Sequence, residues 1–196
     1  MPTPPQLIVL AGPNGAGKST LAPHLLRDTL GINEFVNADK IAEGLSGYSP
    51  EGVAVEAGKI MLQRLYELMK NGRSFAIETT LSGRNWLKLF HRAKEIYGYE
   101  ITIHYLWIDS WALAVDRVNQ RTHHGGHHIP ENTVKRRYRR SITNFLIDYK
   151  ELADVWTIHD TSKDEKILLI ATKENDNEQI IDPLKWDRIH EDIDHD

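Results

Sequence analysis

The stretch Gly12–Ser19 constrains the fold and the chemistry of this chain more than any other part of its sequence. It reads GPNGAGKS and satisfies every position of the pattern G-x-x-x-x-G-K-[ST]. Its glycines allow the backbone to curl around a phosphate group and point several N–H groups inward. A lysine at this position places a positive charge on the β- and γ-phosphates of a nucleotide, and the hydroxyl that follows it is a ligand for Mg²⁺. The motif predicts a nucleoside triphosphate site, and by itself it does not separate a kinase from an ATPase.

The segments on both sides of the motif support this prediction. Residues 7–11 (LIVLA) form a short apolar run, which is typical of a buried parallel strand. From Lys18 to Leu30, leucines recur at helical spacing, and a helix that begins here adds its positive dipole end to the phosphate site. The residues expected to bind the nucleotide are Gly12, Pro13, Asn14, Gly15, Ala16, Gly17, Lys18, Ser19 and Thr20.

Beyond the motif, short apolar runs alternate with longer amphipathic segments along most of the chain. Strands are expected at residues 7–11, 35–38, 74–78, 101–108, 155–159 and 167–171, and helices at 18–30, 50–70, 86–97, 111–121 and 131–149. The last two strands are close enough in sequence to form a hairpin. This alternation favours an α/β fold, in which a mainly parallel sheet is covered by helices.

The overall composition limits the partners of such a protein. The chain has 196 residues, enough for one domain with its own core, and no cysteine, which excludes disulfides and cysteine-bound metals. Its formal net charge is -4, so it has no overall attraction for nucleic acid or for an anionic membrane. No apolar run approaches the roughly 20 residues of a membrane span, and residues 1–6 do not resemble a secretory signal. We expect a cytoplasmic protein without a membrane partner.

The chain is expected to divide into a phosphate-binding domain and a tail. Residues 1–174 form the predicted kinase-type domain, within which residues 117–141 form a helical lid. The remaining sequence is polar and acidic. We predict that residues 175–196 are a solvated acidic tail, in which a short helix at 184–189 can dock through Trp186.

Asp39 is the first carboxylate expected near the phosphates. It ends the segment Asn37-Ala38-Asp39, which directly follows the second predicted strand. In an open parallel sheet, ligands bind beyond the carboxyl ends of the strands, so Asp39 is expected in the same crevice as the phosphate loop. A carboxylate there can act as a catalytic base that accepts the proton of a hydroxyl acceptor. The alternative is that Asp39 only caps the helix that begins at Lys40.

Glu78 follows the third predicted strand in the same way. A carboxylate directly after an apolar strand is an unusual choice unless it has a function. We expect it to orient the acceptor or the water shell of the metal, and Thr79 and Thr80 to donate hydrogen bonds to the substrate. The alternative for this segment is that Thr80 or Ser82 caps the next helix.

Two basic helices joined by a glycine- and histidine-rich loop predict the lid. Arg117 and Arg121 lie four residues apart on one helical face. Arginines that close over a triphosphate stabilise charge at the γ-phosphate and exclude water. The lid residues expected at the site are Arg117 and Arg121 in catalysis, and His128, Arg137 and Arg140 in substrate binding. The alternative for each arginine is a solvated helix face.

The loop of the lid contains His123, His124, His127 and His128. Four histidines are a candidate transition-metal site, but no carboxylate stands near them at ligand spacing. The phosphate motif already implies Mg²⁺, which oxygen ligands hold. We therefore expect one or two of these histidines to contact phosphate or substrate.

Together these segments resemble the zeta-toxin family of P-loop kinases, and its short zeta-toxin-like branch more closely. The matching segments are 12–19 (GPNGAGKS), 37–39 (NAD), 78–82 (ETTLS), 117–121 (RVNQR), 125–130 (GGHHIP), 137–138 (RY) and 140–141 (RS). They follow the order of the family over roughly residues 7–144, which is most of the chain.

The resemblance implies a P-loop NTPase fold, a three-layer α/β sandwich with a helical lid. It implies ATP and Mg²⁺ as cofactors, with Lys18 on the phosphates, Ser19 on magnesium and Asp39 as the base toward a sugar hydroxyl. It also implies that Glu78 lies near the substrate. In the full-length toxins the acceptor is a UDP-N-acetyl sugar, and an antitoxin protein covers the nucleotide site. In similar kinases a loop like Asp160–Lys163 contacts the adenine, and the alternative for this segment is a polar hairpin turn.

Two other functions fit parts of the same pattern. A nucleotide or polynucleotide kinase would use the basic helix Lys135–Arg140 to hold phosphates, although the net charge of -4 and the lack of clustered aromatic residues disfavour nucleic acid. An ATP-binding regulatory module would bind ATP without transferring phosphate. The two carboxylates Asp39 and Glu78 argue for an acceptor site instead.

Overall fold

The computed structural model describes residues 3–47, 50–123, 129–163 and 166–191. Its strands are β1 (Gln6–Ala11), β2 (Phe35–Val36), β3 (Phe75–Thr79), β4 (Glu100–Trp107), β5 (Val155–Lys163), β6 (Lys166–Glu174) and β7 (Asn177–Ile180). Its α-helices are α1 (Lys18–Ala22), α2 (Ala38–Leu45), α3 (Ala54–Lys70), α4 (Asn85–Glu95), α5 (Trp111–His123), α6 (Glu131–Asn144), α7 (Lys150–Leu152) and α8 (Pro183–Glu191). Helices α1 and α6 continue as π-helical segments at Pro23–Thr29 and Phe145–Tyr149, and a 3-10 turn at Pro50–Val53 precedes α3.

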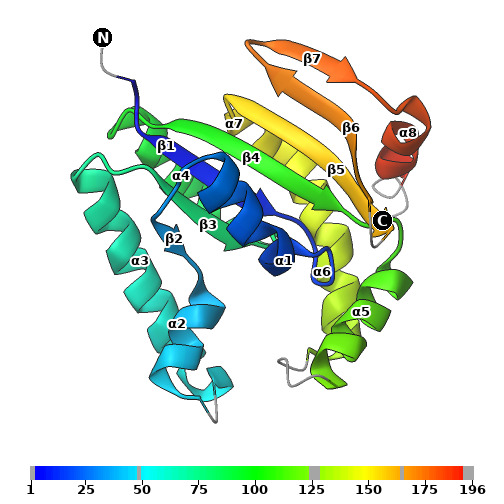
Figure 1. The fold of residues 1–196 in the computed structure, drawn as a ribbon, viewed down its shortest axis with the longest axis horizontal. Coiled ribbons are helices and arrows are strands. Elements are labelled where there is room, and N and C mark those ends of the chain that lie inside the picture. The colour runs from blue at the N-terminus through cyan, green and yellow to red at the C-terminus, as the bar shows by residue number, and fades with distance from the viewer. Residues whose placement is uncertain (1–2, 48–49, 124–128, 164–165, 192–196) are drawn as a thin grey trace.

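The described strands form one seven-stranded sheet in the order β2-β3-β1-β4-β5-β6-β7 (Figure 1). The first five strands in this order are parallel, and β6 and β7 join them as antiparallel strands. The predicted α/β fold with a mainly parallel sheet and a terminal hairpin is therefore confirmed. Because the parallel strands point the same way, the segments that follow β1, β2 and β3 meet at one edge of the sheet.

Helices cover both faces of the sheet and create two apolar layers. Val9 of β1 belongs to the layer that also buries Leu65 of α3 and Phe90 of α4. Leu10, the next residue, belongs to the opposite layer with Val118 of α5. Consecutive residues of a strand point to opposite faces, so a strand that is buried on both faces must be apolar throughout. This requirement explains the continuous apolar run in β1.

The segment predicted to be an acidic tail is instead structured as far as Glu191. β7 pairs with β6, and α8 docks by Trp186 and Ile189, which are 9% and 0% exposed. The indole of Trp186 stacks on that of Trp156 at a centroid distance of 6.1 Å. All four residues of β7 are exposed, so the strand has no hydrophobic alternation that the sequence could reveal. The short helix expected to dock through Trp186 is confirmed, and the solvated tail is wrong for residues 177–191.

Within the described part of the chain, no helix has both the length and the apolar character that a membrane crossing requires.

Two neighbouring strands carry a pair of partly buried histidines near each other. His104 of β4 and His159 of β5 both contact the hydroxyl of Thr157, at 2.9 Å and 3.0 Å. The His104 Nε2 atom is buried, and no hydrogen-bond partner for it lies among the described residues. Burial, with His159 as a second cause, lowers the pKa of His104 to about 4. The folded protein therefore holds this imidazole in its neutral form.

This histidine predicts a loss of stability in mild acid. The unfolded chain takes up a proton near the ordinary pKa of histidine, about 6.5, whereas the folded chain resists it until about 4. Stability is therefore lost as the pH falls through this interval, and His104 contributes about 2 kcal/mol of that loss between pH 7 and pH 5. Urea unfolding of His104→Asn at both pH values should show a smaller loss than the parent protein. The exposed His91→Asn variant serves as the control, and an equal pH dependence in all three proteins would contradict the assignment.

Candidate active site

The phosphate motif forms a tight loop between β1 and α1. Gly12, Gly15 and Gly17 adopt φ angles of 140°, 80° and 81°, which are unfavourable for other residues. A Cβ atom on Gly12 would lie 2.3 Å from the carbonyl oxygen of Leu106, and one on Gly15 would lie 2.6 Å from that of Ala114. Glycine is required at these two positions because backbone atoms of β4 and α5 press against the loop.

Lys18 is held at the centre of this loop. The residue is 7% exposed, and its Nζ donates hydrogen bonds to the carbonyl oxygens of Gly12 and Pro13 at 2.8 Å and 2.9 Å. Burial lowers its pKa to about 8, although the nearby carboxylates of Glu78 and Asp39 favour the charged form. A buried ammonium group that is short of compensating charge provides a favourable environment for an anionic phosphate.

Glu78 joins the ends of three elements. Its carboxylate accepts a hydrogen bond from the Ser19 hydroxyl of α1 at 3.0 Å and one from Asn37 Nδ2 at 2.9 Å. Asn37 is 8% exposed, and its Oδ1 accepts from the backbone N–H groups of Asp39 and Lys40 at the start of α2. Asn37 is thus the N-cap of α2, and the alternative that Asp39 caps this helix is wrong.

The alternative interpretation of the segment after Glu78, in which Thr80 or Ser82 caps the next helix, is wrong. The residue at the N-cap of α4 is Arg84, and no side chain caps this helix. The hydroxyls of Thr80 and Ser82 instead lie 2.9 Å apart, and Thr79 Oγ1 accepts from the backbone N–H of Leu81. Thr79 and Thr80 both line the cavity described next, so they remain available to a ligand.

A single cavity of about 1100 Å³ brings most of the predicted residues together. The predicted residues that line it are Asn14, Gly15, Ala16, Gly17, Lys18, Ser19, Thr20, Asp39, Glu78, Thr79, Thr80, Arg117, Arg121 and Arg137. Gly12 and Pro13 do not line the cavity, but their carbonyl groups hold Lys18. Arg140 is exposed on α6 and does not line the cavity, because it lies nearly one turn beyond Arg137. His128 lies outside the described residues.

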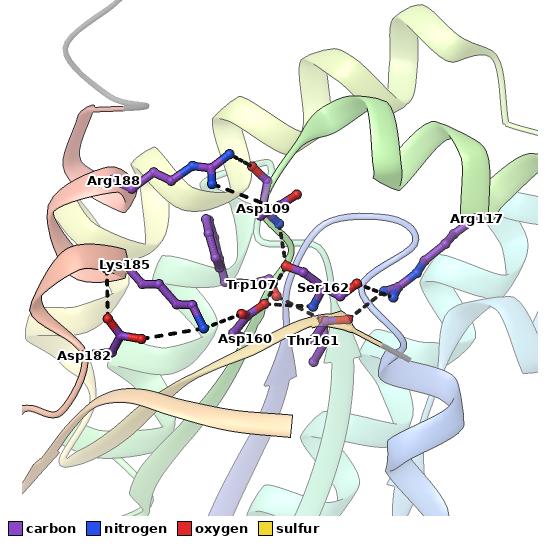
Figure 2. A network of polar contacts seen from close by, with 9 residues as sticks. All are labelled: Trp107, Asp109, Arg117, Asp160, Thr161, Ser162, Asp182, Lys185 and Arg188. Atoms are coloured by element: carbon purple, nitrogen blue, oxygen red, sulfur yellow. Dashed lines mark hydrogen bonds and ion pairs between the residues drawn. The ribbon is translucent and has the colours of Figure 1, made fainter. Parts of the chain in front are cut away.

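Three arginines of the predicted lid, Arg117, Arg121 and Arg137, lie on α5 and α6 and line the cavity with the phosphate loop. Arg121 and Arg137 are close enough to lower the pKa of Lys18, so the charges of all three residues act on the phosphate loop. Arg117 points to the end of β5 and donates to the carbonyl oxygens of Thr161 and Ser162, at 2.8 Å and 3.0 Å (Figure 2). Positive charge from two helices therefore surrounds the loop that is expected to hold a triphosphate.

Met61 and Trp86 are among the lining residues that were not predicted from the sequence. Thr161 and Lys163 also line the cavity, and they belong to the segment Asp160–Lys163 that the resemblance predicted to contact the adenine. Thr161 is 8% exposed, and its hydroxyl lies 3.0 Å from the carbonyl oxygen of Ala16 in the phosphate loop. Residues 160–163 belong to β5, so the alternative of a polar hairpin turn is wrong for them. No local pattern distinguishes Met61 and Trp86, because only the packing of distant elements brings them to the cavity.

Asn37 allows a direct test of how the two carboxylates are held. Asn37→Asp keeps an oxygen that can cap α2, but it replaces the donor to Glu78 by a like charge. If Glu78 acts in phosphoryl transfer, this change should lower the transfer rate about ten- to hundredfold and leave ATP affinity within about threefold. Asn37→Ala removes the cap as well, so it should also lower the free energy of unfolding by about 1 kcal/mol. Steady-state kinetics and urea unfolding measure both effects, and full activity in Asn37→Asp would contradict this role.

The glycine loop after β1, the buried lysine and the mostly parallel sheet with flanking helices define a P-loop NTPase α/β fold. Residues 7–142 match the AAA domain family, and the chain belongs to that family. An uncharacterized protein of Haemophilus influenzae is 31% identical over 131 residues, which cover 67% of this chain and 91% of that protein.

Solved structures with the same fold extend the comparison. The AvrRxo1-ORF1:-ORF2 complex with ATP matches 95% of this chain with a TM-score of 0.79 and 16% sequence identity, and this chain spans 63% of that chain. A structure of the PezAT chromosomal toxin–antitoxin system of Streptococcus pneumoniae matches 100% of this chain and 80% of its own, with a TM-score of 0.68 and 16% identity. At these identities the likeness is one of fold alone.

Proposed function

We propose that this protein is an ATP-dependent phosphotransferase that moves the γ-phosphate to a hydroxyl group of a small acceptor. The observation that carries the proposal is the position of Asp39 and Glu78 beside the phosphate loop, in one cavity of about 1100 Å³. This volume is at or above the upper end of the range of about 300–1,000 Å³ that single-ligand pockets occupy. The site therefore has room for a nucleotide and an acceptor together.

The phosphate loop and the lid would hold the nucleotide. The ammonium group of Lys18 neutralises charge on the β- and γ-phosphates, and the loop amides bind their oxygens. Arg121 and Arg137 add positive charge where negative charge spreads over the transferred group. As the lid closes over the phosphates, water that would otherwise hydrolyse ATP is excluded.

The opposite part of the cavity would hold the acceptor. Asp39 is exposed to the cavity in the first turn of α2, where its carboxylate can accept a hydroxyl proton. Trp86 and Met61 provide an apolar wall next to it. An acceptor with a sugar or base ring fits such a wall, and the resemblance to the zeta-toxin-like branch makes UDP-N-acetyl sugars the first acceptors to test.

The residues present also fit a magnesium ion. The hydroxyl of Ser19, which follows the phosphate-binding lysine, and the carboxylate of Glu78 are oxygen ligands that suit Mg²⁺, and they lie 3.0 Å apart. Mg²⁺ bound there together with ATP would neutralise phosphate charge during transfer. Asn37 fixes the orientation of Glu78, so this donor set does not depend on a mobile side chain.

Incubation with γ-labelled ATP and a panel of acceptors tests the proposal. The panel contains nucleotide sugars, nucleosides and short RNAs, and mass spectrometry identifies the product. Transfer to a small hydroxyl compound supports the proposal, and ATP hydrolysis without transfer to any member would favour an ATP-binding regulatory module. Transfer to RNA that weakens steeply with salt would favour a polynucleotide kinase, for which the exposed arginines of α6 would bind the phosphate backbone.

A protein partner that restrains the enzyme is a second part of the proposal. Two of the structures with the same fold come from an ORF1:ORF2 complex and from a toxin–antitoxin system. A protein encoded beside this chain is the candidate partner. It should co-purify with this chain and lower its affinity for ATP, and unchanged ATP binding in such a complex would contradict the restraining role.

A further inference from the structure

The C-terminal helix α8 is tied to the end of β5 by a largely buried ion pair. Lys185 Nζ lies 2.7 Å from Asp160 Oδ2, and the Asp160 residue is only 5% exposed (Figure 2). A second carboxylate of the same helix end, Asp182, lies 3.6 Å from the same Nζ. Burial by itself raises the pKa of Asp160, but hydrogen bonds from Lys185 and Ser162 outweigh it and lower the pKa. The pair is therefore charged at neutral pH.

The other oxygen of Asp160 orders the next residues of β5. Asp160 Oδ1 accepts hydrogen bonds from the backbone N–H and the hydroxyl of Ser162. The same hydroxyl oxygen accepts from the backbone N–H of Asp109, whose carbonyl oxygen accepts from Arg188 of α8 at 3.1 Å. Two basic residues of α8 thus hold the segment 160–162 and the end of β4 in one network.

This network ends at the nucleotide site. The carbonyl oxygens of Thr161 and Ser162 each accept a hydrogen bond from the guanidinium group of Arg117. The hydroxyl of Thr161 contacts the carbonyl oxygens of Ala16 and Trp107, each at 3.0 Å. A shift of the segment 160–162 would therefore displace a lid arginine and one wall of the phosphate loop together.

We propose that α8 is a positioning element of the nucleotide site, and that Lys185, acting through Asp160, is the residue by which it sets the place of Arg117 and the phosphate loop. The inference rests on the proposed function for the identity of the nucleotide. By this proposal, the contacts of α8 raise the affinity of the site for ATP. Lys185 and Asp160 touch no reacting group, so they are positioning residues.

Helix α8 is docked on the sheet mainly by apolar contacts, so the positioning role of Lys185 can be tested apart from docking. Trp186 stacks on Trp156, Ile189 is fully buried, and Lys150 lies 5.3 Å from the Trp186 ring. These contacts hold α8 on the sheet without Lys185. Removal of the Lys185 charge should leave the helix in place, while Asp160 loses its partner and the segment 160–162 relaxes.

Equilibrium binding of a fluorescent ATP analogue to the full chain tests the proposal. Lys185→Met should weaken binding about three- to tenfold at a temperature well below its unfolding midpoint, which should itself fall because the buried Asp160 carboxylate loses its partner. Lys185→Arg keeps the charge beside Asp160 and should restore most of the affinity. The matched control is Lys173→Met, which removes an ion pair with Asp176 on the neighbouring hairpin and should leave the affinity unchanged.

A double-mutant cycle with Arg117→Met shows whether the effect passes through the lid arginine. If it does, Lys185→Met should weaken binding less in the Arg117→Met background than in the parent. Unchanged affinity in Lys185→Met, an equal loss in Lys173→Met, or strictly additive effects in the cycle would overturn the proposal. Because the readout is nucleotide binding, absence of phosphate transfer in the acceptor panel would contradict the proposed function and leave this test intact.

Discussion

Lys18→Ala is expected to lower phosphoryl transfer by about 10²- to 10³-fold and to weaken ATP binding strongly. The reason is that Lys18 is the cation enclosed by the phosphate loop, where burial makes its interaction with a phosphate stronger than in water. Initial rates with γ-labelled ATP and equilibrium binding of an ATP analogue measure the two effects. Lys88→Ala, which removes an exposed lysine of α4, is the control and should behave as the parent. Parent-like binding and turnover in Lys18→Ala would exclude the nucleotide site described above.

The lowered pKa of Lys18 adds a pH dependence to this prediction. In the protein without nucleotide the amine loses its proton near pH 8, because burial lowers its pKa to about that value. Binding of a phosphate requires the charged form, so ATP affinity should fall as the pH rises from about 8 to 9.5, approaching about tenfold per pH unit. Lys18→Arg keeps its charge throughout this range and should bind ATP with a flat pH profile, even if its affinity is lower. A flat profile in the parent would contradict the assignment.

Asp39→Asn is expected to lower phosphate transfer about 10³-fold and to leave ATP affinity nearly unchanged. The amide has almost the shape of the carboxylate but cannot accept the proton of the acceptor hydroxyl. The fold should tolerate the change, because Asn37 caps α2 and Asp39 is exposed to the cavity. Single-turnover transfer to the acceptor that the panel identifies, together with ATP binding, separates the two quantities.

Asp176→Asn makes the same chemical change at a distant position. Asp176 lies in the turn between β6 and β7 with a φ of 58°, a conformation that asparagine accepts readily. This variant should retain full transfer activity. Full activity in Asp39→Asn as well would show that another group, such as Glu78, serves as the base.

Local sequence rules predicted most of the site residues that the structure brings to one cavity. The strand before Gly12, the glycine loop and the helix at Lys18 are contiguous, so each part could be inferred from residues a few positions away. Asp39 and Glu78 required one further step, because the shared direction of parallel strands brings the ends of β2 and β3 together. The same reasoning missed the position of Arg140, because the sequence does not fix how far α6 extends past the cavity.

The C-terminal segment shows where such rules fail. β7 carries no buried residue, so nothing in its sequence indicates a strand. The docking of the next helix through Trp186, in contrast, was predicted from the sequence. The network from Lys185 to Arg117 joins residues more than sixty positions apart, so no spacing in the sequence could indicate it.

The sequence by itself determined the phosphate loop, the α/β class and the two acidic strand ends, because short-range spacing and strand direction are written in neighbouring residues. Only the tertiary structure decided that Asn37 holds Glu78 and that Arg117 rests on the carbonyl groups of β5. It also decided that β7 pairs with β6 and so belongs to the folded domain. These features depend on hydrogen bonds and burial between elements that are distant along the chain, and such contacts exist only once the sheet has formed.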